Sequence, residues 1–185
     1  MEAIRNLIER TSSSHLALPI PSREEMNTIY AAALRAPDHK GLKPSRFIEV
    51  SGDGLEKLSN IFSSFAKIKN PDIDQTKIER YKKMPYRAPL VMVLVSSVVE
   101  NKKVPEIEQM MSTACAAQCI LLALNALNYS GIWRTGELSF NKEISKLLGL
   151  DDNECVIGYL YIGTDTGPVK NIEGNNLQDF VSIWD

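Results

Sequence analysis

The chain has 185 residues, 44% of them hydrophobic, which is enough to bury one sizeable core and indicates a single domain over residues 1–185. A formal net charge of -2 provides no basic field for nucleic-acid phosphates, so no nucleic acid is expected as a partner. The N-terminus shows no leader pattern, and three cysteines are an odd count, so a reduced, cytoplasmic protein is expected.

Two amphipathic helices are predicted in the first part of the chain. Apolar residues at helical spacing predict the first over residues 3–10, and the hydroxyl-rich run after it favours local turns. Ser22 and Glu25 have the spacing of a capping box, which predicts the start of the second helix. The residues expected to line its buried face are Met26, Ile29, Tyr30 and Ala33.

The stretch from Leu34 to Phe47 follows the second helix and holds two prolines, four cations and one of the two histidines. Pro37 stops the helix, so Arg35 is expected near its last turn and His39 in a loop. Composition leaves two interpretations open. Either Arg35 caps the helix C-terminus beside a solvated loop, or the loop binds a ligand.

Two strands and two helices are predicted in the centre of the chain. A short strand over residues 47–51 is followed by a helix over residues 55–69. A polar helix over residues 72–83 has few apolar anchors, which fits a solvated helix or a mobile cover segment. Residues 90–95 are continuously apolar, which predicts a central strand buried on both faces.

The longest helix is predicted from residue 106 to Tyr129, with Gly131 just beyond its end. Its apolar run is too short to span a membrane, so a core helix is expected. Cys115 and Cys119 are interpreted as buried small hydrophobes. Small residues on its surface would let a helix of a second subunit approach, which suggests a homodimer; they are Ser112, Thr113, Ala114, Ala116 and Ala117.

The last part of the chain begins with a glycine-bracketed segment, residues 131–136, which presents an aromatic ring, a guanidinium and a hydroxyl in succession. A short helix is predicted to stop at Gly149, and a second apolar strand is predicted over residues 155–162. The tail from Leu177 to Trp184 is too apolar to remain in water, so it is expected to be covered.

The chain lacks a phosphate-binding glycine loop, a dinucleotide fingerprint, a nucleophile motif and a metal-ligand cluster. An enzyme with this sequence would therefore depend on a bound organic cofactor. Donors suited to an anionic, aromatic cofactor occur in the Leu34 to Phe47 stretch, in Arg10 with residues 11–14, and in residues 133–135. Taken singly, Arg10 is more often a surface charge and Trp133 a core residue.

Four motifs together resemble the nitroreductase family, and within it the small YdjA-type members. They are Arg10-Thr11-Ser12, Arg35-Ala36-Pro37-Asp38-His39-Lys40, Arg87-Ala88-Pro89 and Gly131-Ile132-Trp133-Arg134-Thr135-Gly136. The resemblance runs from residue 1 to about residue 163. It implies an α+β fold with a central mixed, mainly antiparallel sheet flanked by helices, a long core helix, and an obligate homodimer with FMN at the subunit interface.

The resemblance also implies a set of site residues and a reaction. Residues Arg10, Thr11 and Ser12 would bind the phosphate and ribityl end of FMN, and the site would be completed by Trp133, Arg134 and Thr135. Arg35 and His39 would reach the flavin from the partner subunit. In the implied ping-pong reaction, NAD(P)H reduces FMN, which passes electrons to a nitroaromatic, quinone or similar small acceptor. No catalytic side chain, metal or membrane is implied.

One position departs from the family pattern. Thr11 stands where members carry a second arginine, and His15 stands near a later cation. Fewer fixed charges predict weaker retention of FMN. The departure keeps a second interpretation open, in which the protein binds flavin or a partner without turnover and retains the fold and the dimer.

Overall fold

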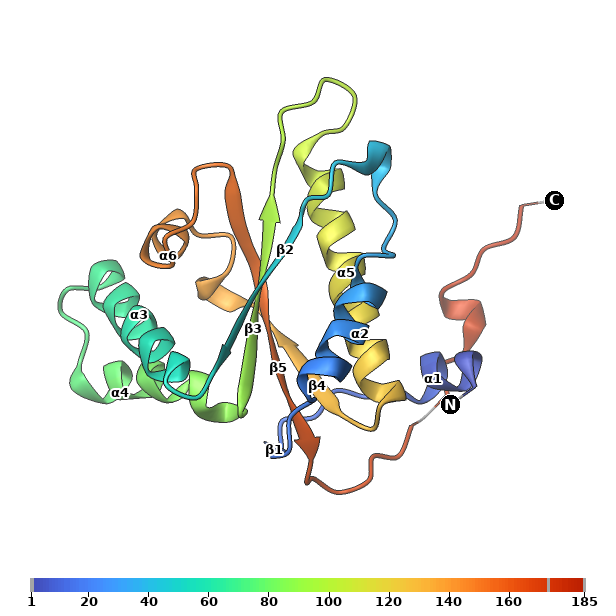
Figure 1. Cartoon of the computed structure of the whole chain (residues 1–185), viewed down its shortest axis with the longest axis horizontal. Helices are drawn as coiled ribbons and strands as arrows, with labels where there is room; N and C mark the ends of the chain where they lie inside the picture. The colour runs from blue at the N-terminus through green and yellow to red at the C-terminus, as the bar shows by residue number, and fades with distance from the viewer. Residues whose placement is uncertain (1, 173, 185) are drawn as a thin grey trace.

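The computed structural model describes residues 2–172 and 174–184, so Met1, Glu173 and Asp185 of the predicted domain lie outside the described residues. A single sheet stands between two groups of helices (Figure 1), with strand order β1-β5-β3-β2 and β4 also paired to β5. The strands are β1 (Leu16–Ala17), β2 (Ser45–Ser51), β3 (Leu90–Ser97), β4 (Ser130–Arg134) and β5 (Glu154–Asp165).

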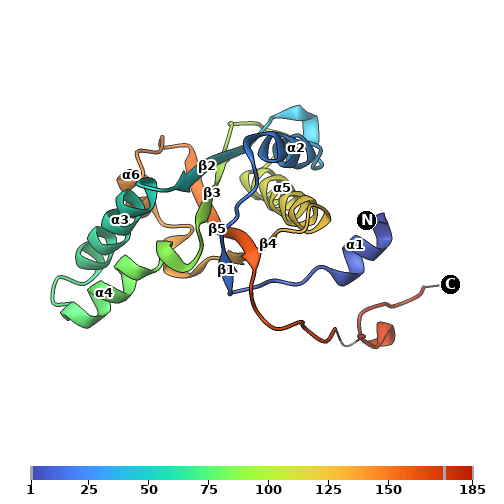
Figure 2. The same cartoon turned by 60° about the horizontal axis from the view of Figure 1, so that its bottom comes forward.

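Helices cover both faces of the sheet (Figure 2). One face packs against α2 (Arg23–Ala33) and α5 (Glu106–Ala126), and the other against α3 (Gly54–Lys69) and α6 (Lys142–Leu147). The remaining helices are α1 (Ala3–Glu9), α4 (Gln75–Lys83) and the short 3-10 helices η1 (His39–Gly41), η2 (Pro85–Arg87), η3 (Gly136–Leu138) and η4 (Leu177–Asp179).

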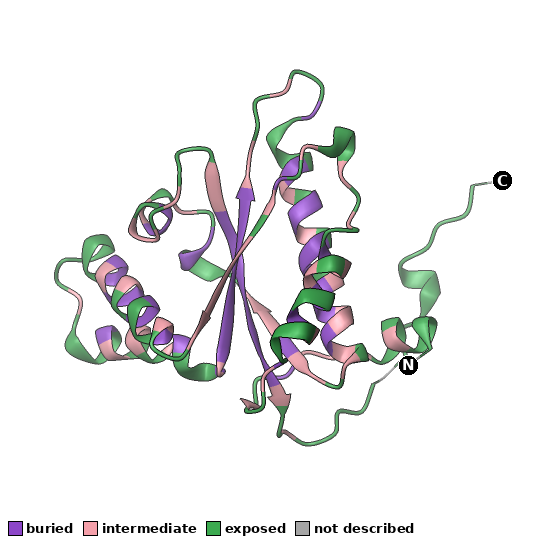
Figure 3. Ribbon diagram, in the orientation of Figure 1, coloured by how far each residue is buried: buried purple, intermediate pink, exposed green. Residues whose placement is uncertain are grey.

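The strand β3 is the centre of the core, as predicted. Alternate side chains belong to two different apolar clusters, because successive residues of a strand point to opposite faces. Leu90, Met92 and Leu94 face α2 and α5, whereas Val91 and Val93 face α3. Burial is therefore highest along this strand (Figure 3).

The sheet differs from the expected mixed one, since every strand pairing among the described residues is antiparallel. Helices α3 and α4 return the chain to the end of the sheet where β2 leaves it, so Leu90 pairs with Ser51. The segment after α5, which was not predicted as a strand, forms β4 along β5. The strand pattern of this segment is weakened by Gly131. Glycine is needed there because a Cβ would lie 3.0 Å from the Tyr161 carbonyl oxygen.

The helix α5 ends at Ala126, not at Tyr129, because Asn128 with φ of 64° adopts the left-handed conformation expected of a glycine. The predicted subunit contact through its small residues is wrong. Ser112, Thr113, Ala116 and Ala117 are buried inside the chain. The Ser112 hydroxyl, for example, donates to the Pro37 carbonyl oxygen over 2.7 Å. α5 is long and apolar enough to cross a membrane, yet this buried side identifies it as a core helix.

The opposite side of α5 is only partly covered by the described part of the chain, since Ile107, Met111 and Cys115 are exposed. Cys115 is exposed and Cys119 half-buried, so their interpretation as buried hydrophobes is wrong. Both belong to a stripe spaced by three or four positions, which is one face of a helix. We call it the open face of α5, formed by Ile107, Met111, Cys115, Cys119 and Leu122.

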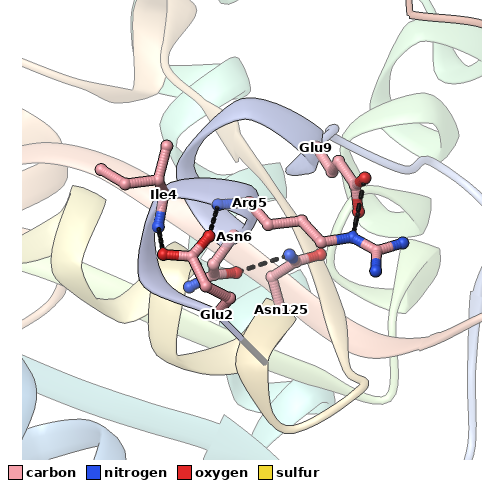
Figure 4. Close-up of polar contacts among 6 residues, drawn as sticks. All are labelled: Glu2, Ile4, Arg5, Asn6, Glu9 and Asn125. Atoms are coloured by element: carbon pink, nitrogen blue, oxygen red, sulfur yellow. Dashed lines mark hydrogen bonds and ion pairs between the residues drawn. The ribbon is translucent and has the colours of Figure 1, made fainter.

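The helix α1 is attached to the C-terminal part of α5 through polar contacts (Figure 4). Asn6 donates to the Leu122 carbonyl oxygen over 3.0 Å and accepts from Asn125 over 2.7 Å. Its predicted apolar stripe stays outside, with Ile4, Leu7 and Ile8 exposed by 54% to 66%. The expectation of a covered tail is also wrong for the single chain. Phe180 is 75% and Trp184 96% exposed, and the tail projects beyond α1 (Figure 1).

Candidate functional site

Residues 10–12 leave α1 and run between the start of β4 and the end of β5. The Ser13 N–H donates to the Gly131 carbonyl oxygen over 3.4 Å, and the Ser13 hydroxyl donates to Asp165 Oδ1 over 2.6 Å. Residues 10–12 are half-buried, and Nη1 of Arg10 is buried without a hydrogen-bond partner among the described residues. Ser13 therefore holds the C-terminal end of this segment in place. The Arg10 guanidinium at its other end keeps a donor without a partner among the described residues.

Residues 133–135 occupy the end of β4. Trp133 lies across Gly158 of β5, where a Cβ would come 2.0 Å from the indole Nε1. Only glycine leaves room for this ring, and its φ of 155° favours glycine as well. Nε1 of Trp133 and Nε of Arg134 are both buried without a partner among the described residues. Thr135 is exposed at the turn that follows.

The structure brings these two groups of predicted site residues together. Ser13 meets β4 at Gly131, and Trp133 follows two residues further along the strand, about 7 Å away. Residues 10–12 and 133–135 thus border the same edge of the sheet.

Arg35 and His39 lie elsewhere in the single chain. His39 Nδ1 lies 2.9 Å from Glu108 Oε2 in the first turn of α5, whereas α1 contacts the same helix at Leu122. These contacts are 14 positions apart (122 minus 108), or about 21 Å along a helix. His39 is therefore far from α1 and from the segment of residues 10–12 that follows it within one chain.

The loop that carries His39 has a fixed shape. The Asp38 carboxylate accepts from the backbone N–H groups of Leu42 and Lys43 over 3.0 and 2.7 Å. Lys40 and Lys43 have φ of 63° and 53°, a conformation that costs free energy for any residue but glycine. The Arg35 guanidinium makes no hydrogen bond within the described chain, which removes support from the helix-capping interpretation.

A cavity of about 550 Å³ opens beside β4 on the sheet face that carries α4. Its walls include the predicted residues 133–135 and five others to which the sequence assigned no role, namely Tyr81, Met84, Arg87, Tyr159 and Tyr161. Their only sequence signal is the Arg87-Ala88-Pro89 motif, since the tyrosines read as ordinary strand and helix residues. Burial raises the pKa of Tyr159, so its hydroxyl stays protonated and donates to the Leu138 carbonyl oxygen over 2.9 Å.

Lys170 is a second residue that sequence reasoning missed. Its Nζ donates to the Ser12 carbonyl oxygen, and it borders a cavity of about 680 Å³ together with Thr11. It thus places a cation near the position where Thr11 replaces the family's arginine. Burial raises the pKa of Asp165, but hydrogen bonds from Ser13 and Gly167 outweigh this and hold it below its usual range. The separation of 158 positions between Lys170 and Ser12 explains why no local pattern revealed the contact.

The residues at this edge fit a phosphorylated aromatic cofactor. Among the described residues, five side chains have a buried polar atom without a hydrogen bond, and three of them are Arg10, Trp133 and Arg134. Such atoms are rare because each one loses its hydration without compensation. Guanidinium donors suit phosphate and carbonyl oxygens, and the aromatic walls suit a planar ring.

The fold and this set of donors define an α+β protein built to hold a cofactor at the edge of an antiparallel sheet. The sequence model of the Nitroreductase family matches residues 7–164. The chain belongs to the nitroreductase family, a family of oxidoreductases.

Individual relatives agree with this assignment. The chain is 37% identical over 164 residues to "Putative NAD(P)H nitroreductase YdjA" of Escherichia coli K12, covering 89% of this chain and 88% of that one. It is 32% identical over 165 residues to a Haemophilus influenzae protein described as "Putative NAD(P)H nitroreductase", covering 89% of each. A nitroreductase-like family protein from Bacillus cereus shares the fold with a TM-score of 0.84 at 18% identity, covering 100% and 97% of the two chains.

Proposed function

We propose that the protein is an FMN-dependent oxidoreductase that takes electrons from NAD(P)H and passes them to a nitroaromatic, quinone or related small acceptor in a ping-pong scheme. The observation that carries this proposal is that Arg10, Trp133 and Arg134, from two segments at the same sheet edge, each have a buried donor atom without a hydrogen bond among the described residues. A structural neighbour is described as an FMN and NADPH-dependent nitroreductase and has a TM-score of 0.79 at 16% identity, covering 100% of both chains. We infer a cytoplasmic enzyme with one domain over residues 1–185.

The chain itself would bind and orient the reactants. Bound FMN would supply the redox chemistry, which the side chains of this protein lack. Arg10, Ser12 and Lys170 would hold its phosphate end, while Trp133 to Thr135 would border its ring. The Tyr159 hydroxyl keeps the turn after Thr135 in place through its bond to Leu138. No side chain needs to transfer a proton, because water can deliver it.

The open face of α5 supports the proposal of a homodimer. Closed dimers are twofold, and we place the axis perpendicular to α5, so that two copies packed through this face have antiparallel α5 helices. The Glu108 end of one helix would then lie beside the Leu122 end of its partner. Arg35 and His39 of the partner subunit would thereby reach residues 10–12 and 133–135. The exposed stripe of α1 would extend the apolar contact.

This arrangement predicts a cross-link through Cys115, which lies midway between Glu108 and Leu122 and so at the twofold axis. Helix axes about 8–10 Å apart, with Cα atoms about 2.3 Å from each axis, bring facing Cα atoms to about 3.4–5.4 Å. A disulfide spans that distance. We expect mild oxidation to give a covalent dimer on non-reducing gels, and Cys115→Ser to abolish it while Cys119→Ser keeps it. A dimer that forms no Cys115 cross-link would contradict this packing.

The purified protein tests the proposed activity. We expect a flavin absorption band that NAD(P)H bleaches under nitrogen and that a nitroaromatic restores. A flavin that stays oxidised with both nicotinamide donors would instead support the non-catalytic flavin-binding protein. A colourless protein that takes up no added FMN would contradict both functions.

A further inference from the structure

The cavity between α4 and β4 has two guanidinium groups and an aromatic wall. Arg87 stands at its mouth and is exposed, while Arg134 lies in its wall with its Cζ 5.8 Å from the centre of the Tyr161 ring. Tyr81 and Tyr159 complete the aromatic lining. Aromatic faces combined with paired cations suit a planar ring that carries a negative charge.

The charge of Arg87 is available to a ligand. Two cations of α4 are paired, Lys82 with Glu79 over 2.9 Å and Lys77 with Asp74 over 3.2 Å. The Arg87 side chain has no ion pair or hydrogen bond within the described residues. No carboxylate of the cavity wall except Glu137 opposes it, and Glu137 pairs with Lys69.

The positive charges of Arg87 and Arg134 both influence the Tyr161 hydroxyl in the cavity wall. Burial raises the pKa of Tyr161, while the charges of Arg87 and Arg134 act in the opposite direction. The Tyr161 hydroxyl is thus within electrostatic reach of both cations. An anionic group entering beside it would meet two positive charges and a hydroxyl donor.

We propose that this cavity binds an electron acceptor whose aromatic ring bears a carboxylate, and that Arg87 determines this specificity. The inference rests on the proposed function, because residues 133–135, which we place beside FMN, also line this cavity. The ring would lie among the tyrosines, with its carboxylate between Arg87 and Arg134. For 4-nitrobenzoate, one NAD(P)H and one proton would remove one nitro oxygen as water and leave the nitroso carboxylate and NAD(P)⁺.

The test compares an anionic acceptor with a neutral one of the same shape. We expect kcat/KM to be higher for 4-nitrobenzoate than for nitrobenzene, and Arg87→Gln to lower that ratio about tenfold or more, as expected for a lost charged hydrogen bond. Lys83→Gln is the matched control, because it removes a nearby cation, at the end of α4, that does not line the cavity. Its ratio should stay within about twofold of the parent value.

A binding measurement keeps this test separate from turnover. Calorimetry with benzoate and the oxidised FMN-loaded protein should show binding that weakens about tenfold in Arg87→Gln and less in Arg87→Lys, which retains the charge. Equal benzoate affinity in the parent and Arg87→Gln would overturn the proposal. Loss of FMN from Arg87→Gln would assign the cavity to the cofactor and overturn it as well. A protein that NAD(P)H fails to reduce would refute the proposed function, while the benzoate result would still decide the role of Arg87.

Discussion

Arg10→Ala is expected to raise the dissociation constant for FMN about 10- to 150-fold, because it removes charged hydrogen bonds worth about 1.5–3 kcal/mol. The buried, unpartnered Nη1 places this guanidinium where a phosphate would satisfy it. Quenching of FMN fluorescence by the apoprotein gives the constant directly. Arg5→Ala is the matched control, since Arg5 lies on α1 just before Arg10 and its side chain pairs with Glu9 at the surface. Full FMN occupancy in Arg10→Ala would place the phosphate elsewhere.

Thr11→Arg is expected to change the FMN dissociation constant in the opposite direction to Arg10→Ala. Restoring the family's arginine should lower the FMN dissociation constant, because it adds a cation beside the phosphate end of the site. An unchanged constant would contradict the predicted weak retention of FMN and would indicate that Lys170 already supplies the missing charge.

The second large effect concerns dimers that combine two different defective chains. Arg10→Ala and Arg35→Ala should each be nearly inactive alone, yet heterodimers of the two should recover about half of the parent activity. In such a heterodimer, one site lacks both arginines, whereas the other joins an intact Arg10 to an intact Arg35 of the partner subunit. Co-expression with two different tags and sequential affinity purification isolates the heterodimer for assay.

A heterodimer that recovers no activity would contradict the shared site. If each site took Arg10 and Arg35 from one chain, every site of the heterodimer would carry one defect, and mixing would restore nothing. The homodimer of the double variant Arg10→Ala/Arg35→Ala, purified in the same way, provides the baseline. The experiment therefore distinguishes a shared site from a site within one chain without a structure of the dimer.

Local patterns predicted most of the elements. The capping box of Ser22 and Glu25 is present in both directions, and the apolar run over residues 90–95 is the buried centre of β3. The strand β4 was not predicted, because Gly131 weakens the pattern of a strand of only five residues. Close packing against β5 requires glycine at this position. The end of α5 was misplaced because Asn128 also adopts the left-handed conformation that favours glycine.

The site was predictable only where its residues form contiguous motifs. Residues 10–12 and 133–135 were each named from sequence, but their proximity depends on the contact between Ser13 and Gly131. Lys170 and the tyrosines of the cavity come from distant segments, and no pattern in the sequence joins them. The orientation of α5 was also beyond prediction, because an apolar helix without a polar side does not show which face the core will cover.

The weak attachment of α4 has a consequence for the choice of acceptor. Only Ile78 of this helix is buried, yet the helix supplies Tyr81 to the cavity wall. Besides Ile78, Tyr81 packs against the core, and the Ser59 hydroxyl donates to the Lys82 carbonyl oxygen over 2.9 Å. Few contacts therefore hold this helix, and such a helix opens at a fraction of the free energy needed to unfold the domain. We therefore expect that the bulk of an acceptor is limited by the local stability of α4, and that substitutions which strengthen its anchoring narrow the range of acceptors.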